Sequence, residues 1–297
     1  MKETNNVEQR PSTSLSKGAR RNQILRRITV VGVIAAVITA AFAGYCLHRE
    51  RVEEKQKAEE LRKEKQDKKE AEKVKSKPET AEQKLERVRK QATEHGYPKN
   101  VIELLDKNVE TVDFVADYEK KKDKPYADTI GKDLSQGGIP ELLQWDERWG
   151  YAPYGTSIVA ASGCGPTCMA MVAAGLNQDA SITPAKVAAY GTEHGYVDEE
   201  NNTYWRFMDE AGANWKLNST AGLLSEEQVA LELSQGHPII CSVGPGDFTT
   251  EGHFIVLTGY EDGKIKVNDP NCRARSTLWE YEELQGQIRN LWAFEKN

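Results

Sequence analysis

The 297-residue sequence has only five cysteines, no Cys-x-x-Cys pair and a single long apolar run. These shortages argue against a disulfide-dense miniprotein, a zinc module and a multi-span transporter. Basic residues are also scarce where a folded domain is expected, because residues 91–297 hold 17 Lys/Arg against 32 Asp/Glu. Phosphate contacts need clustered Lys/Arg, so we expect no nucleic-acid partner. We also expect no metal and no cofactor.

The apolar run is Ile28–Leu47, 20 residues without a formal charge. A helix needs about 20 such residues to cross a bilayer, so we predict a transmembrane helix at 28–47 after a basic cytoplasmic tail at 1–27. A cleaved signal peptide is the alternative, because Ala41-Phe42-Ala43 has the form of a cleavage site. The long N-terminal region and the length of the run favour an uncleaved anchor.

Basic residues flank the run on both sides, so their number alone does not set its orientation. Large C-terminal domains are translocated largely regardless of charge. We therefore expect a single-pass protein of the cell membrane, with the N-terminus in the cytoplasm and the C-terminal domain outside the cell.

Residues 48–78 are dominated by Glu and Lys, with pairs such as Glu53 and Lys57 spaced four residues apart. These pairs favour a solvated helix, whereas the apolar residues are too sparse for a coiled-coil seam. We predict a charged helical stalk that ends at Pro78.

Two folded parts are expected after the stalk. Residues 79–136 read as an accessory helical segment and a linker, with too few apolar residues for a core of their own. Residues 137–297 have the size of one domain and an α+β pattern, helices first and an antiparallel sheet second. The expected helices are 165–176, 184–193, 204–210 and 226–235, and the expected strands are 238–243, 254–260, 265–268 and 290–294.

The stretch Ser162-Gly163-Cys164-Gly165-Pro166-Thr167-Cys168 precedes an apolar helical pattern. Cys164 is therefore expected at a helix N-terminus, where backbone N–H groups lower the pKa of a thiol and favour the nucleophilic thiolate. Cys168 is expected to be a buried core residue. Cys241 also reads as strand core, and a Cys241–Cys272 bridge is left open.

A thiolate nucleophile needs an imidazole to carry the proton, and the chain has five histidines. His253 is the best placed, because it comes directly after Gly252 at the start of an expected strand. Asn268 or Asp269 at the end of the next strand could orient it. With the hairpin turn at Asp262-Gly263, a regular register puts Asn268 on the face of His253, and Asp269 requires sheet coiling or a bulge near Gly259.

Together these residues resemble the papain-like cysteine peptidases related to the bacteriocin-processing, double-glycine-leader peptidases. The resemblance covers about residues 137–297 and is carried by Gln144 in LLQWDERWG, the CGPT turn, GHFIVL and VNDP. It implies a papain-like fold, with a helical half carrying Cys164 and an antiparallel sheet half carrying His253 and Asp269. It further implies Cys164 as nucleophile, His253 as general base and acid, Asp269 as the group orienting the imidazole, and Gln144 as oxyanion donor.

We therefore predict a bacterial, membrane-anchored, surface-exposed cysteine peptidase that works through a Cys164 thioester on a peptide or protein substrate. One alternative is a peptidoglycan amidase or endopeptidase of the NlpC type, acting on cell-wall peptide. Another is a papain-like module that binds peptides without cutting them. The aromatic residues near Gln144, which are Trp145, Trp149, Tyr151 and Tyr154, could line a groove or cover the core.

Overall fold

The computed structural model describes residues 17–75, 79–134, 136–222 and 225–297. The chain divides into two units, Met1–Pro78 and Glu79–Asn297. Most of the predicted basic tail and the predicted stop at Pro78 lie outside the described residues.

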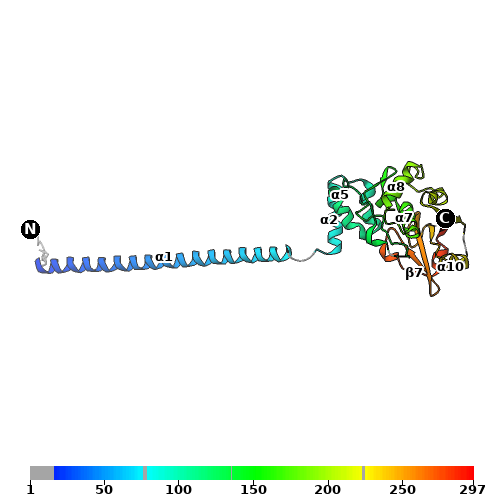
Figure 1. The fold of residues 1–297 in the computed structure, drawn as a ribbon. Helices are drawn as coiled ribbons and strands as arrows, with labels where there is room; N and C mark the ends of the chain where they lie inside the picture. The colour runs from blue at the N-terminus through cyan, green and yellow to red at the C-terminus, as the bar shows by residue number, and fades with distance from the viewer. Residues whose placement is uncertain (1–16, 76–78, 135, 223–224) are drawn as a thin grey trace, which may run out of the picture. The chain divides into compact units, whose positions relative to one another are not determined.

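The first unit contains one helix, α1 (Lys17–Lys75), which includes the predicted span and most of the predicted stalk (Figure 1). Its apolar side chains are exposed, as at Ile28, Ile38 and Phe42. The helix is long and apolar enough to cross a membrane, judged by length and composition. A stretch of exposed apolar side chains needs an apolar surrounding or a partner, and a bilayer supplies the first.

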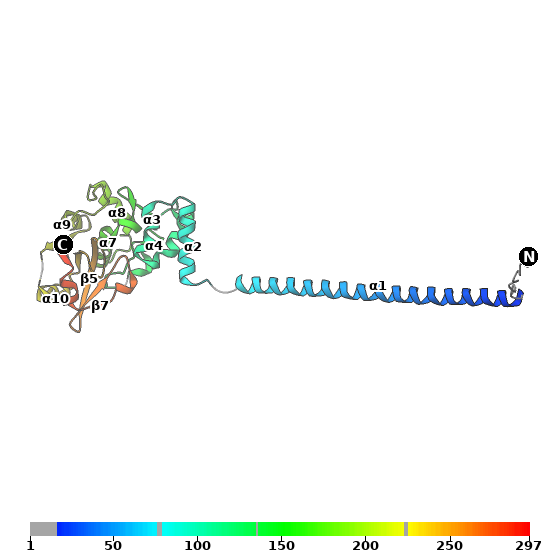
Figure 2. The same cartoon turned by 180° about the vertical axis from the view of Figure 1, so that it is seen from behind.

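The second unit begins with a group of short helices, here called the lead-in helices: α2 (Ala81–Glu94), α3 (Lys99–Ile102), α4 (Leu104–Lys107), the 3₁₀ turn η1 (Val109–Thr111) and α5 (Val112–Lys121). Thr80 caps α2 through a capping box with Gln83. Their buried side chains, among them Leu104 and Phe114, pack with Trp145 and Tyr151 of the next segment of the chain. The lead-in helices thus share a core with that segment, and they gather at one side of the unit (Figures 1 and 2).

The remaining helices are α6 (Val159–Ser162), α7 (Cys164–Asn177), α8 (Pro184–Glu193), α9 (Arg206–Glu210), α10 (Glu226–Ser234) and α11 (Tyr281–Gln285), with 3₁₀ turns at Gly131–Asp133 (η2), Ala211–Trp215 (η3) and Arg273–Arg275 (η4). Several of these helices begin at a capping residue that the sequence indicates. Thr183 caps α8 with Pro184 in its first turn, and Ser225 forms a capping box with Gln228 at α10. Helix α7 is apolar almost all round and is buried over nearly its whole length.

Six antiparallel strands form the main sheet in the order β3-β8-β4-β5-β6-β7. They are β3 (Leu217–Ala221), β4 (Ile239–Val243), β5 (His253–Glu261), β6 (Lys264–Asn268), β7 (Leu278–Trp279) and β8 (Ile288–Lys296), and a separate hairpin joins β1 (Pro153–Tyr154) to β2 (Ser157–Ile158). Alternate residues of β5 pack in two different cores, one on each face of the sheet. Phe254 and Val256 pack with α7, whereas Ile255 and Leu257 pack in the cluster that contains residues of α10 and α11. The predicted α+β order is therefore confirmed.

The register of the β5–β6 hairpin corrects one expectation. Asp262 and Gly263 form the turn with positive φ values of 50° and 83°, as their sequence predicts. Leu257 then pairs with Val267 but Gly259 pairs with Lys266, so Thr258 is an extra residue in β5. This bulge shifts the pairing by one beyond it, which puts residue 269 opposite 255 and on the same face as 253. The expectation that Asn268 shares the face of His253 was wrong, because it assumed a regular ladder.

Candidate active site

Cys164 is the first residue of α7, directly after the N-cap residue Gly163. The turn is tightly packed, because a Cβ on Gly165 would lie 2.6 Å from Thr203 Oγ1. That hydroxyl is itself held by the Tyr154 hydroxyl at 2.7 Å. Close approach of Thr203 therefore accounts for the glycine after Cys164, and it fixes the start of the helix where the sequence predicts it.

His253 begins β5 and is 9% exposed. Its Nε2 lies 2.8 Å from Asp269 Oδ1, so Nδ1 is the ring nitrogen left to interact with the Cys164 thiol. Gly252, just before it, has open space where a Cβ would stand. The bulged register thus brings together Cys164, His253 and Asp269, while the amide of Asn268 donates to the carbonyl oxygen of Pro140.

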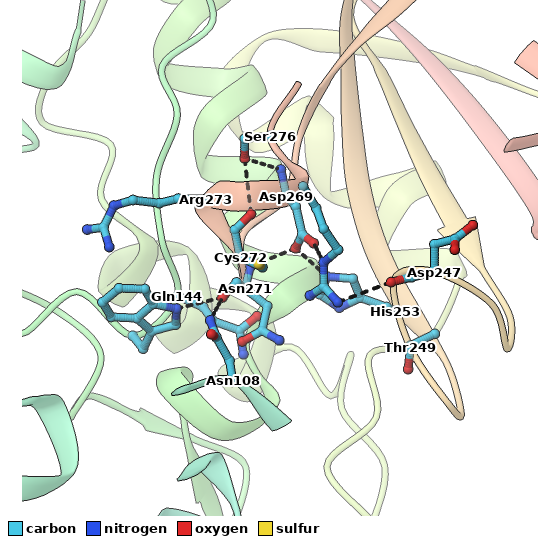
Figure 3. A network of polar contacts seen from close by, with 12 residues as sticks. Asn108, Gln144, Asp247, Thr249, His253, Asp269, Asn271, Cys272, Arg273 and Ser276 are labelled. Atoms are coloured by element: carbon cyan, nitrogen blue, oxygen red, sulfur yellow. Dashed lines mark hydrogen bonds and ion pairs between the residues drawn. The ribbon is translucent and has the colours of Figure 1, made fainter. Parts of the chain in front are cut away.

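Asp269 is fully buried and makes three further polar contacts, shown in part in Figure 3. Its Oδ1 accepts from the backbone N–H of Asn271 at 2.8 Å, and its Oδ2 accepts from Arg275 Nε at 2.6 Å. Its own N–H donates to Ser276 Oγ at 3.0 Å. Burial would raise the pKa of Asp269, but the charges of His253 and Arg275 and these hydrogen bonds hold it below its ordinary value. The carboxylate is therefore ionised and oriented.

The thiol and the imidazole shift each other in opposite directions. Burial would raise the pKa of Cys164, but the hydrogen bond and charge of His253, together with the N–H groups of Phe254 and Gly165, bring it below the ordinary value. Burial would lower the pKa of His253, but the charge and hydrogen bond of Asp269, followed by Cys164, raise it well above the ordinary value. Both directions favour a thiolate beside an imidazolium.

Gln144 is 5% exposed and lines the same cleft as Cys164 and His253. Its backbone N–H donates to Pro270 O at 2.7 Å, and its side-chain Nε2 donates to Ala160 O at 2.7 Å. A primary amide has two N–H donors, so one remains after the bond to Ala160. The side chain is thus fixed, and it retains a donor that an oxyanion in the cleft could use.

The cleft around Cys164 has a volume of about 710 Å³. It is bordered by three groups of residues: Leu104, Asp106 and Lys107 of α4; residues 200–203 and Trp205; and residues 246–252 of the loop before His253. Among the described residues, no three His, Cys, Asp or Glu side chains gather as metal ligands would.

Other candidate residues have structural positions. The four aromatic residues near Gln144 are 8% exposed or less, so they cover the core and do not line a groove. Cys168 and Cys241 are buried as expected, and each is a free thiol, as is Cys272. Hence no Cys241–Cys272 bridge is formed.

Two contributors to the site were absent from our sequence-based prediction. Arg275 pairs with Asp269, and Asn108 of the lead-in helices donates to the carbonyl oxygen of Asn271. An arginine six residues after a candidate aspartate is a weak signal for the first. The second joins residues 163 positions apart, and no local pattern could indicate it.

The sequence matches the Peptidase_C39 like family over residues 138–294, just over half of the chain. No curated protein matches it.

Several solved structures are similar, including these three. The peptidase domain of Streptococcus ComA, a bi-functional ABC transporter involved in quorum sensing, is 21% identical, with 45% of this chain and 90% of that one covered and a TM-score of 0.36. A C39-like peptidase of Bacillus anthracis is 13% identical, with 55% and 98% covered and a TM-score of 0.37. A double glycine motif protease from an AMS/PCAT transporter, in complex with its leader peptide, is 17% identical, with 55% and 97% covered and a TM-score of 0.36.

The family match covers the whole segment that contains Gln144, Cys164, His253 and Asp269. The chain therefore belongs to the Peptidase_C39 like family, and this segment has the papain-like α+β fold expected for it.

Proposed function

We propose that this protein is a membrane-anchored cysteine peptidase whose active domain faces the outside of the cell. The observation that carries the proposal is that Cys164 and His253 line one cleft, with the imidazole paired to the buried Asp269 carboxylate behind it and interacting with the thiol. The apolar part of α1 supplies the anchor, and translocation of the large C-terminal part follows the usual behaviour of such domains.

In the proposed reaction, the Cys164 thiolate attacks the carbonyl carbon of the scissile peptide bond. The negative charge that develops on the carbonyl oxygen is met by the free N–H of the Gln144 amide and by the backbone N–H of Cys164. The His253 imidazolium, oriented by Asp269, gives its proton to the leaving amine as the C–N bond breaks. A thioester remains on Cys164.

In the second half of the reaction, His253 is neutral and removes a proton from a water molecule that attacks the thioester. The C–S bond breaks, the carboxylic acid leaves, and the proton returns the site to its starting state. Asp269 keeps its charge throughout, because its role is to hold the imidazole and to stabilise its protonated form.

The experiment is thiol labelling of the full chain in detergent across about pH 4–9, comparing the parent with Cys164→Ala and His253→Ala. We expect rapid alkylation of Cys164 below about pH 7 that is lost with His253. The same chains are then given a peptide library, and we expect cleavage by the parent alone. Alkylation that rises only near about pH 8.5 and ignores His253 would contradict the proposal and favour a peptide-binding module.

The membrane location is tested separately by treating intact cells that express the full chain with an added protease. We expect digestion of the 79–297 unit from outside and protection of the N-terminal tail. Protection of the whole chain in intact cells would place the active unit in the cytoplasm instead.

A further inference from the structure

The loop of residues 270–275, directly after Asp269, faces the catalytic group on its inner side. The N–H of Asn271 donates to Asp269 Oδ1, and Arg275 Nε donates to Asp269 Oδ2. Two of the hydrogen bonds that orient the carboxylate therefore come from this loop. Any displacement of the loop would change the direction in which Asp269 presents its oxygen to His253.

On its outer side the same loop is held by Asn108, between α4 and η1. Asn108 Nδ2 donates to the carbonyl oxygen of Asn271, which also accepts from Trp145 Nε1 at 2.7 Å. The Oδ1 atom of Asn108 accepts from the N–H of Glu110 at 2.9 Å. This second bond fixes which way round the amide lies, so its donor points at Asn271 (Figure 3).

Glu110 provides a second attachment. Its Oε2 accepts from the backbone N–H of Arg273 at 3.3 Å and lies 3.5 Å from Arg273 Nη1, and its Oε1 accepts from Cys272 Sγ at 3.6 Å. The guanidinium of Arg273 lies over the ring of Trp145, 4.6 Å from its centroid. Asn108 and Glu110 thus contact three consecutive residues of the loop, 271 to 273.

Within residues 270–275 the one element of regular structure is the three-residue turn η4. Fixing the backbone of such a segment costs conformational entropy, which its contacts must offset. The contacts are supplied from the lead-in helices on one side and from the catalytic carboxylate on the other. The loop therefore links the lead-in helices to the active site.

We propose that Asn108 and Glu110 are positioning residues of the peptidase, holding the 270–275 loop so that Asp269 stays directed at His253. This inference rests on the proposed function and adds that the lead-in helices are a working part of the enzyme. The effect passes from Asn108 through Asn271 and Asp269 to His253, and from there to the Cys164 thiol. Leu104, Asp106 and Lys107 of α4 also border the cleft, which is consistent with an integral role.

The test compares Asn108→Asp with Asn100→Asp in the full chain in detergent. Asp at 108 keeps the acceptor for the Glu110 N–H but replaces the donor to Asn271 O with a carboxylate oxygen. Asn100 is a matched control, because its Nδ2 also joins the lead-in helices to the rest of the unit, but through Ser157 Oγ at 2.8 Å. A second pair is Glu110→Gln with Asp113→Asn, where Asp113 is exposed and pairs with Lys84.

The readout is the pH profile of Cys164 alkylation by iodoacetamide, with Cys164→Ala as background and thermal melting as a check of folding. We expect Asn108→Asp to move the profile about one pH unit toward that of a free thiol, which is about tenfold slower labelling on the acid side. Glu110→Gln should give a smaller shift in the same direction. Asn100→Asp and Asp113→Asn should leave the profile of the parent unchanged.

An unchanged profile in Asn108→Asp, or an equal shift in Asn100→Asp, would overturn the positioning role. If Asn108→Asp does not fold, Glu110→Gln and Glu110→Ala decide the matter by the same profile. A parent chain whose Cys164 behaves as a free thiol would instead contradict the proposed function, and the positioning role with it. The two failures are therefore distinguishable.

Discussion

The first and second turns of α7 each carry a cysteine, and the pKa values of the two thiols are shifted in opposite directions. The pKa of Cys164 is lowered, whereas burial and the nearby charges of Cys164 and Asp269 raise the pKa of Cys168 well above its ordinary value. Both thiols lie at the same end of one helix, but Cys168 is fully buried and Cys164 is partly exposed at the cleft. The His253 imidazole and the backbone N–H groups of Phe254 and Gly165 lower the pKa of Cys164, and Cys168 has no such partners among the described residues, so position on the helix alone does not set the pKa.

The largest expected effect comes from removing each cysteine in turn. Cys164→Ala should abolish peptide cleavage, because the thioester cannot form. Cys168→Ala should leave cleavage within a few-fold of the parent and cost on the order of 1 kcal/mol of stability, because it removes one buried atom. Product formation and thermal melting measure both. Comparable losses of cleavage in the two variants would mean that the difference in pKa between the two thiols does not decide which of them reacts.

Removing the His253 imidazole should remove most of the difference in pKa between the Cys164 and Cys168 thiols. In His253→Ala, Cys164 loses the partner that lowers its pKa, so burial dominates as it does at Cys168. In the parent we expect alkylation to begin below the free-thiol pKa, and in the variant it should begin only above about pH 8.5. We expect cleavage to fall by about 10²–10⁴-fold. Labelling of His237→Ala, whose histidine pairs with Glu232 away from the cleft, serves as control.

A change at Gln144 should separate two contributions to the proposed reaction, which are the activation of the Cys164 thiol and the stabilisation of the oxyanion. Gln144→Ala leaves His253 and Asp269 in place, so the alkylation profile of Cys164 should match that of the parent. The turnover number should fall by about 10²–10³-fold, because one oxyanion donor is lost. Loss of low-pH alkylation in this variant would show that Gln144 acts on the thiol and not on the oxyanion.

The smallest effect is expected at Arg275. The folded-state pKa of Asp269 lies below its unfolded value, so its contribution to stability is present above the unfolded pKa and is lost as pH falls through the folded pKa. Arg275→Gln removes a charge that lowers this pKa, so acid unfolding should begin at a higher pH. Melting curves between about pH 3 and 6 would measure the shift. Arg289→Gln, a change at an exposed arginine that contacts Gly286 O and Ile288 O, should leave the curve unchanged.

Local signals were sufficient for much of the fold. Gly163 and Pro166 around Cys164 indicate a helix start, Ser225 with Gln228 indicates another, and Asp262-Gly263 indicates the hairpin turn. These signals work because capping and positive φ depend on a few adjacent residues. The candidate Gln, Cys, His and Asp came from residue type, order and resemblance. In the structure Gln144, Cys164 and His253 line one cleft, and Asp269 is buried behind His253.

The features that could not be predicted depend on distant contacts. The bulge at Thr258 lies directly after the part of β5 that pairs with β4, and a register built from the β5–β6 hairpin alone does not contain it. Arg275 and Asn108 enter the site because the 270–275 loop folds back toward the lead-in helices. Their contacts are tertiary, and periodicity along the chain carries no information about them.

The bulge at Thr258 also makes the proposed site depend on the number of residues in the β5–β6 hairpin. Because side chains alternate between faces, deleting the bulge residue Thr258 while the turn is kept would restore a regular ladder and put Asn268, not Asp269, on the face of His253, although all four candidate residues would remain in the sequence. A neutral amide would then stand where the imidazolium needs a counter-charge. The proposed site therefore needs the bulge in this hairpin as well as the four residues.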